Sequence, residues 1–366
     1  MNAARILLIA GVLIVSSCVL LLGVIALVKF RRGRAAVRSM DLLAPYRGAL
    51  IAMASGVDDD GQAKAALYAV PEHTWDRLRS SVIAFLSKVR GTPADDLREL
   101  LRSHGEIERA TRMLNSRSAV RRAKAAYLLG LVRDPHSAAI MLSLLGDPDA
   151  SVRLVATRAL GAIGDPSAAS GILQALRSHH GQIGLPARVA AEALSAMGGQ
   201  VAPALQIGLA SDDPAVRNVC AVVVGHCTFA SAAPQLRIVL ATDSEGDVRA
   251  SAAVALGQVG GADDVVALAE HTDASEATIL RRTCAAALGD LGQPESLDTL
   301  AGLLGDGDRR LAQLAADALV GIGAEGIVRL KRVAATTRQG PSARVARGAL
   351  DLAGLRGQLA LSAKGR

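Results

Sequence analysis

Histidine and cysteine are the side chains best suited to metal binding or nucleophilic chemistry, and their spacing in this sequence supports neither. The 366 residues include seven histidines and four cysteines. A glutamate lies next to or near a histidine at three places, Glu72-His73, Glu270-His271 and His104/Glu106. The pair His179-His180 lies in a predicted loop. The cysteines form no CxxC pair and have no zinc-site spacing, so we expect small buried thiols rather than a metal centre or a disulfide framework. The cysteines are Cys18, Cys220, Cys227 and Cys284.

Motifs for phosphate binding or acyl transfer are also missing from the sequence. It contains no P-loop, no GxSxG elbow and no paired catalytic carboxylates. The glycine-rich stretch GLLGDGDRR at 302–310 falls between predicted helices and is interpreted as a turn. We therefore predict that the protein is not an enzyme, with no catalytic, cofactor-binding or metal-binding residues.

Charge is concentrated at one end of the chain. Residues 1–90 carry 12 Lys and Arg against 6 Asp and Glu, whereas residues 91–366 carry 29 against 28. A nucleic-acid groove needs clustered positive charge to displace counterions from phosphates. The near-neutral remainder of the chain therefore argues against a nucleic-acid partner.

The basic residues flank a long apolar run. Residues 6–28 contain no charge, and at about 1.5 Å per helical residue they are long enough to span the roughly 30 Å hydrocarbon layer of a bilayer. Lys29, Arg31, Arg32, Arg34 and Arg38 follow this run, and the positive-inside rule places the C-terminal part in the cytoplasm. We predict a transmembrane anchor at 1–28 and a basic juxtamembrane linker at 29–40. The protein would then be a single-pass protein of the cell inner membrane.

Two alternatives to an uncleaved anchor remain open. A secretory signal peptide has a shorter apolar core and a small-residue exit. The stretch VSSC at 15–18 is similar to a lipoprotein processing box, which would make Cys18 a lipidated residue. The continued apolar run and the basic cluster after Cys18 favour the anchor.

Residues 41–115 have helical character without a clean repeat. Residues 71–90 place Trp75, Leu78, Val82 and Leu86 at helical spacing, and 92–115 predicts two short helices. We expect a helical capping region, with a partner-docking role for 71–90 as the alternative.

From residue 116 to 354 one alanine-rich sequence motif recurs at intervals of 30 to 34 residues. Such a period predicts an all-α solenoid of helical hairpins, followed by a C-terminal tail at 355–366. We call its most regular site the repeat glycine position; its occupants are Gly130, Gly161, Ser195, Gly225, Gly257, Gly289, Val320 and Asp351.

The second copy shows how one unit is built. Asp165-Pro166 can begin a helix, because Asp accepts hydrogen bonds from free amides and Pro suits the first helical position. In the other helix Val152, Ala156 and Leu160 fall on one stripe, and Gly164 suits its end. Small side chains would let neighbouring hairpins stack closely.

These residues resemble the HEAT-repeat family in its short bacterial form, the PBS-lyase HEAT-like repeat. The resemblance rests on DP-x3-VR-x2-A and ALGAIGDP as they stand at 147–166, with their counterparts in other copies. It implies a structural Asp–Arg ladder between repeats, with each Asp six residues before an Arg and with interruptions at Ala187 and Ala312. The expected ladder residues are Asp147, Arg153, Arg217, Asp243, Arg249 and Arg281, with Arg122 at the same position of the first copy.

Enzymes occur within this repeat class, but the sequence lacks the residues that characterise them. Deoxyhypusine hydroxylases are expected to use His-Glu dipeptides to hold two irons, and no His-Glu dipeptide occurs in this chain. A HEAT-like DNA glycosylase would need a basic, aromatic face.

The resemblance therefore favours a membrane-anchored scaffold that binds a protein partner at the cytoplasmic face. The partner is expected to be membrane-associated, for example a membrane glycosyltransferase or a similar assembly, while residues 6–28 contact the lipid bilayer. The alternative is a lyase-like HEAT enzyme or chromophore-attachment factor. Candidate partner-surface residues lie off the buried stripe; they are Arg158, Arg188, Asn218, Arg282, Gln313 and Arg344.

Overall fold

The computed structural model describes residues 45–58, 60–177, 184–336 and 340–364, with side chains up to residue 355. The predicted anchor at 6–28, the basic linker, Cys18 and the His179-His180 pair lie outside the described residues. Among the residues that are described, no helix is both long and apolar enough to cross a membrane.

The described chain is helical and divides into two compact units, Met1–Arg112 and Met113–Arg366, with the boundary inside α5. In the first unit residues 45–55 are helical, followed by α2 (Gln62–Tyr68), α3 (Glu72–Leu86), α4 (Thr92–Ser103) and α5 (Glu106–Leu114). The helix predicted at 71–90 and the two predicted at 92–115 are thus confirmed.

Trp75 is a central buried residue in the core of the first unit. Its ring is 1% exposed and stacks on His104 with centroids 3.7 Å apart, and its Nε1 donates to Glu106 Oε1 at 2.9 Å. Arg79 also donates to this buried carboxylate. Because the apolar side of α3 is buried within the unit, the structure favours a packing role for this helix over partner docking.

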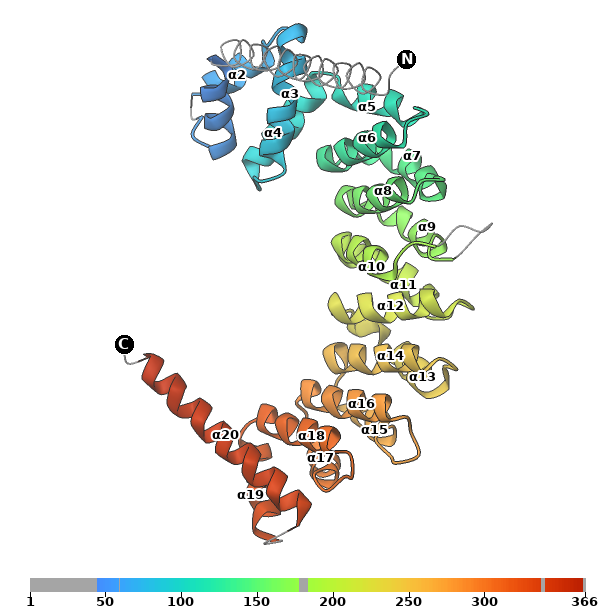
Figure 1. Ribbon diagram of the computed structural model, residues 1–366, viewed down its shortest axis with the longest axis vertical. Helices are drawn as coiled ribbons and strands as arrows, with labels where there is room; N and C mark the ends of the chain where they lie inside the picture. The colour runs from blue at the N-terminus through green and yellow to red at the C-terminus, as the bar shows by residue number, and fades with distance from the viewer. Residues whose placement is uncertain (1–44, 59, 178–183, 337–339, 365–366) are drawn as a thin grey trace, which may run out of the picture. The chain divides into compact units, whose positions relative to one another are not determined.

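The second unit repeats one hairpin, in which a long helix is followed by a second, shorter helix, with a 3₁₀ turn between them in every copy but α18–α19 (Figure 1). The long helices are α6 (Ala119–Val132), α8 (Ala150–Ile163), α10 (Ala187–Ala196), α12 (Pro214–His226), α14 (Gly246–Val259), α16 (Thr278–Leu291) and α18 (Arg309–Ile322). The helices that alternate with them are α7 (Ala138–Ser143), α9 (Ala169–Gln174), α11 (Ala202–Gly208), α13 (Ala233–Thr242), α15 (Val265–Glu270), α17 (Leu297–Leu303) and α19 (Ala324–Thr336).

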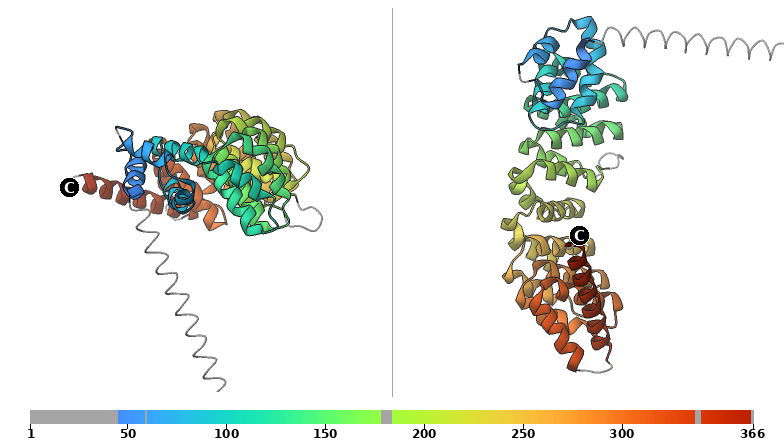
Figure 2. Two further views of the ribbon diagram at one scale, coloured as in Figure 1. Left: turned by 90° about the horizontal axis from the view of Figure 1, so that it is seen from above. Right: turned by 90° about the vertical axis from the view of Figure 1, so that its left-hand side faces the viewer.

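The long helices form one layer of the second unit and the alternating helices form the other (Figure 1; right-hand view in Figure 2). The helix-start and helix-stop signals act as expected. The Asp149 carboxylate accepts from the backbone amide of Ser151 at the start of α8, and Gly164 ends that helix at a φ of 81°. The Asp165 carboxylate caps the following 3₁₀ turn, Pro166–Ala168.

Neighbouring long helices approach most closely at the repeat glycine position. A Cβ added at Gly130 would lie 2.6 Å from the Cα of Ala159, and one added at Gly161 would lie 2.7 Å from the Cα of Ala193. Gly225, Gly257 and Gly289 make equivalent contacts with alanines of the next long helix. Glycine is needed there because any side chain would displace the neighbouring backbone.

Most of the predicted C-terminal tail at 355–366 is helical. The last helix, α20, runs from Pro341 to Lys364 and includes residues 355–364. The segment contains no proline after residue 341 and is rich in Ala and Leu, which favour continued helix.

Candidate protein-binding surface

Arginines near the start of several long helices connect neighbouring repeats through contacts with carboxylates. Arg122 on α6 donates from Nε and Nη2 to Asp147 at 2.7 and 2.8 Å. Arg217 on α12 binds Asp243 in the same way, at 2.6 and 2.8 Å. We call these arginine–carboxylate contacts the inter-repeat bridges.

These two bridges also satisfy the backbone of the turns that they join. Arg217 donates from Nη1 to the backbone carbonyl of Ser211, in the turn before its own helix. Asp243 accepts from the backbone amide of Glu245. The hydrogen bond from Arg217 outweighs burial and lowers the pKa of Asp243, so the pair stays charged.

Two further inter-repeat bridges differ from these in their carboxylate partner or in their number of contacts. Arg249 binds Glu276, whose pKa is lowered by this hydrogen bond and by a second contact with His271. Arg281 donates to Asp306 at 2.5 Å. Because the partner lies 25 to 27 residues after the arginine, these contacts cross between repeats.

The expected pairing of an Asp with the Arg six residues later needs correction. Arg153 donates from Nη1 to the backbone carbonyl of Asp147, while the Asp147 carboxylate binds Arg122. Likewise Arg249 donates to the backbone carbonyl of Leu240, and the Asp243 carboxylate binds Arg217. An arginine at the helix start reaches back to the carbonyls of its own turn, which leaves the carboxylate directed toward the preceding repeat.

The six candidate surface residues do not behave alike. Arg158 and Arg344 are exposed, and Arg188 is exposed beside Glu192, one helical turn away on α10. Asn218 is half-buried and accepts a hydrogen bond from Ser251, and Gln313 donates to Asp317.

Arg282 is a correction to the predicted surface. It donates from Nε and Nη2 to Asp308 at 2.6 and 2.8 Å, so it forms another inter-repeat bridge. Asp308 in turn caps α18, and the Arg282 contact lowers its pKa to about 2.

The sequence analysis missed the apolar part of this surface. Tyr127, Val222 and Val254 are 48%, 42% and 45% exposed, although their residue types favour burial. All three stand three residues before the repeat glycine position and therefore share one face of the long-helix layer. This register was readable from the sequence. We call this surface the long-helix face.

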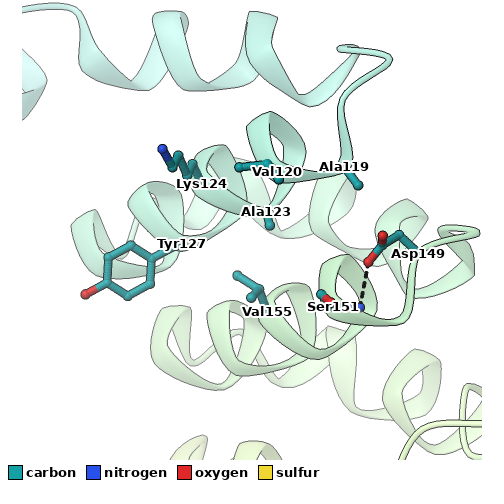
Figure 3. Close-up of a pocket in the computed structure, with 8 residues that line it drawn as sticks. All are labelled: Ala119, Val120, Ala123, Lys124, Tyr127, Asp149, Ser151 and Val155. Carbon is teal, nitrogen blue, oxygen red and sulfur yellow. Dashed lines mark hydrogen bonds between the residues drawn. The ribbon is translucent and has the colours of Figure 1, made fainter. Parts of the chain in front are cut away.

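A hollow of about 350 Å³ opens on the long-helix face between α6 and α8. Val120 and Ala123 of α6 lie across from Val155 of α8, with Tyr127 at one end and Asp149 at the other (Figure 3). A largely apolar floor with a polar rim is typical of a surface that receives another protein.

A second hollow, of about 200 Å³, lies further along the same face, on α12 and α14 with Thr283 of α16. Val222 and Val254 are among its lining residues. Between the two hollows the exposed side chains include the charged residues Arg158 on α8 and Arg188 and Glu192 on α10. The face therefore alternates apolar and charged areas.

The described residues include no group of three or more His, Cys, Asp or Glu side chains that could hold a metal ion. Cys220 and Cys284 are buried free thiols, and burial raises the pKa of each to about 12. These two thiols pack in the interior as the sequence indicated, whereas Cys227, which was also expected to be buried, is half-buried.

Solved structures share the helical-repeat architecture. A mutant of Kap121p is 12% identical over 87% of this chain and 41% of its own, with a TM-score of 0.52. Kap121p bound to Pho4p is also 12% identical, over 87% of this chain and 40% of its own, with a TM-score of 0.50. The CpcE–CpcF phycocyanin lyase complex from Nostoc sp. PCC7120 is 20% identical over 68% of this chain and 94% of its own, with a TM-score of 0.31. The chain thus corresponds to about two fifths of Kap121p, and the likeness concerns the fold. No curated protein sequence gives a significant match.

Family models cover the repeats directly. HEAT repeats match residues 107–195 and 201–288, and the PBS lyase HEAT-like repeat matches residues 280–306. These segments contain the glycine contacts and most of the inter-repeat bridges described above. The chain belongs to the HEAT-repeat family.

Proposed function

We propose that this protein is a non-enzymatic scaffold that binds a protein partner through the long-helix face. The observation that carries the proposal is the alignment of Tyr127, Val222 and Val254 at one register position, each beside a hollow. Apolar side chains repeated on one face are unfavourable in water unless a partner covers them. Mixed charges between the hollows would add specificity.

The proposal includes a membrane tether. The uncharged run at 6–28 and the basic residues that follow it support a single-pass anchor in the inner membrane, with the HEAT array in the cytoplasm. A tethered array would meet partners that are themselves at the membrane. A membrane glycosyltransferase assembly is one such partner class.

Site-specific photo-crosslinking in cells tests the binding face. A photoreactive residue is placed in the full chain at Val222, on the long-helix face, or at Ile238, which is 54% exposed on α13 in the other layer. We expect one or a few defined protein adducts from position 222 and none from position 238. Equal labelling at both positions, or no adduct at 222, would contradict the proposal.

The same material tests the remaining parts. The full chain should sediment with membranes and resist extraction by salt, and a C-terminal reporter should be active only in its cytoplasmic form. Purified full-length protein carrying a bound metal or a visible chromophore would instead favour the enzyme or chromophore-attachment alternative.

A further inference from the structure

The second hollow on the long-helix face continues into a polar one. The apolar hollow is lined in part by Val222 and Val254, and a neighbouring hollow of about 410 Å³ is lined in part by Asp290. His226 and Gln258 line both, so the two form one groove over α12, α14 and α16. We call this the α12–α16 groove.

The apolar end has room for a side chain rather than a small molecule. Its volume of about 200 Å³ is smaller than that of typical small-molecule pockets, about 300–1,000 Å³. Two exposed valines and the methyl groups of Ala221 and Ala250 line it. An aliphatic side chain placed there would remove these groups from water.

The other end carries a negative charge that no other side chain of the described residues pairs with. Asp290 is an exposed residue there, none of the described residues forms a hydrogen bond or ion pair with its carboxylate, and partial burial raises the pKa of this group. The groove also runs along helix C-termini, because α12 ends at His226 and α16 ends at Leu291, one residue after Asp290. The C-terminus of a helix carries partial negative charge and favours a nearby cation.

We infer that the α12–α16 groove binds an extended segment of the partner protein in which an aliphatic side chain is followed closely by a lysine or arginine. The aliphatic side chain occupies the hollow beside Val222 and Val254, and the cation pairs with Asp290. Charge complementarity favours this occupant over an acidic segment. The inference rests on the proposed function, since it specifies what the long-helix face recognises.

Defined peptides test this recognition on the purified full chain. Fluorescent peptides with a Gly-Ser background carry one Leu and, one to three residues later, either Arg or Glu. Fluorescence anisotropy should show the Arg peptide of at least one spacing binding about three- to fivefold more tightly than its Glu counterpart, as for an exposed ion pair. Equal affinity for Arg and Glu peptides, or no binding by any peptide, would overturn the inference.

Matched variants separate the carboxylate from general charge. Asp290→Asn should abolish the preference for Arg over Glu, whereas Asp317→Asn removes one negative charge from α18, outside the groove, and should leave it intact. Val254→Ser should weaken all Leu peptides alike. An Arg preference that survives Asp290→Asn would also overturn the inference.

The outcomes separate this inference from the proposed function. If position 222 crosslinks a partner in cells but Asp290→Asn alters neither that adduct nor the peptide preference, only the inference fails. If position 222 crosslinks no partner, the proposed function fails whatever the peptides show.

Discussion

Two junctions between repeats show different ways of holding neighbouring hairpins together. Between α14 and α16, a Cβ added at Gly257 would lie 2.9 Å from the Cα of Ala287, and Arg249 bridges to Glu276. Between α10 and α12, Ser195 occupies the repeat glycine position and Ala187 occupies the arginine position. Helix α10 is also shorter, with 10 residues against 14 for α14.

At the α10–α12 junction both halves of the bridge are missing. Asp147, Asp243 and Asp306 each lie six residues before the arginine position of the next long helix, and Ser211 stands at that site before Arg217. Ala187 and Ser211 thus replace both halves together. Losing one partner would leave a buried charge without its hydrogen bonds, whereas losing both leaves none. The α10–α12 junction is therefore simpler, and we expect it to be weaker.

The largest effect should come from breaking a bridge on one side. Arg217→Ala leaves Asp243, whose side chain is 3% exposed, without its bidentate partner. We expect the free energy of unfolding to fall by about 2–4 kcal/mol and the melting temperature of the full chain by about 5–10 °C, followed by circular dichroism. Arg188→Ala, which removes only an exposed pair with Glu192, is the control and should cost less than about 0.5 kcal/mol. Similar losses in both variants would refute the role of the bridge.

A smaller effect should follow from placing alanine at the repeat glycine position of the two kinds of junction. Gly130→Ala places a Cβ 2.6 Å from the Cα of Ala159, so the backbone of α8 must move. We expect a loss of about 2 kcal/mol, despite the better helix propensity of alanine. Ser195→Ala should change stability by no more than about 0.5 kcal/mol. Denaturant unfolding of both variants compares the junctions, and a harmless Gly130→Ala would remove the close-contact argument.

Acid should weaken the bridged junctions selectively. Because the Arg217 hydrogen bond lowers the pKa of Asp243 in the folded chain, this group stabilises the fold above the ordinary Asp pKa of about 3.9. That stabilisation disappears as pH falls through the lowered folded-state pKa. Asp243→Asn should thus be less stable than the parent near neutral pH, and the difference should shrink in acid. A difference that stays constant from pH 7 to about pH 3 would contradict this linkage.

The sequence was a good guide to the repeat and a poor one to contacts between repeats. Helix ends and helix starts depend on residues that are close in the sequence, such as Gly164 and Asp165. The spacing of the repeat glycines likewise shows where neighbouring long helices approach each other. The partner of Asp147 could not be chosen in this way, because Arg122 lies 25 residues away and is brought close only by stacking. The resemblance indicated a ladder, but the stacking geometry decides its connections.

The candidate surface was predicted only in part, for a similar reason. The helical pattern predicts that polar residues off the buried stripe lie on the surface, yet the guanidinium of Arg282 is held by Asp308 across a repeat boundary. It predicts that apolar residues lie in the core, yet Val222 and Val254 are exposed. Whether a side chain is covered depends on the neighbouring helix, and the pattern of a single helix does not contain that information.

Cys220 and Cys284 provide matched probes of the central claim that bridges and glycine contacts determine the strength of each junction. Both lie five residues before the repeat glycine position, both are buried, and burial raises the pKa of each thiol to about 12. Reaction with a thiol reagent therefore requires local opening. Cys220 lies on α12, beside the α10–α12 junction, and Cys284 lies on α16.

Pulsed thiol labelling of the native full chain, read by peptide mass spectrometry, tests this claim most directly. The account predicts that Cys220 reacts about tenfold faster than Cys284, which corresponds to about 1.4 kcal/mol in opening free energy. Equal rates, or faster labelling of Cys284, would contradict it.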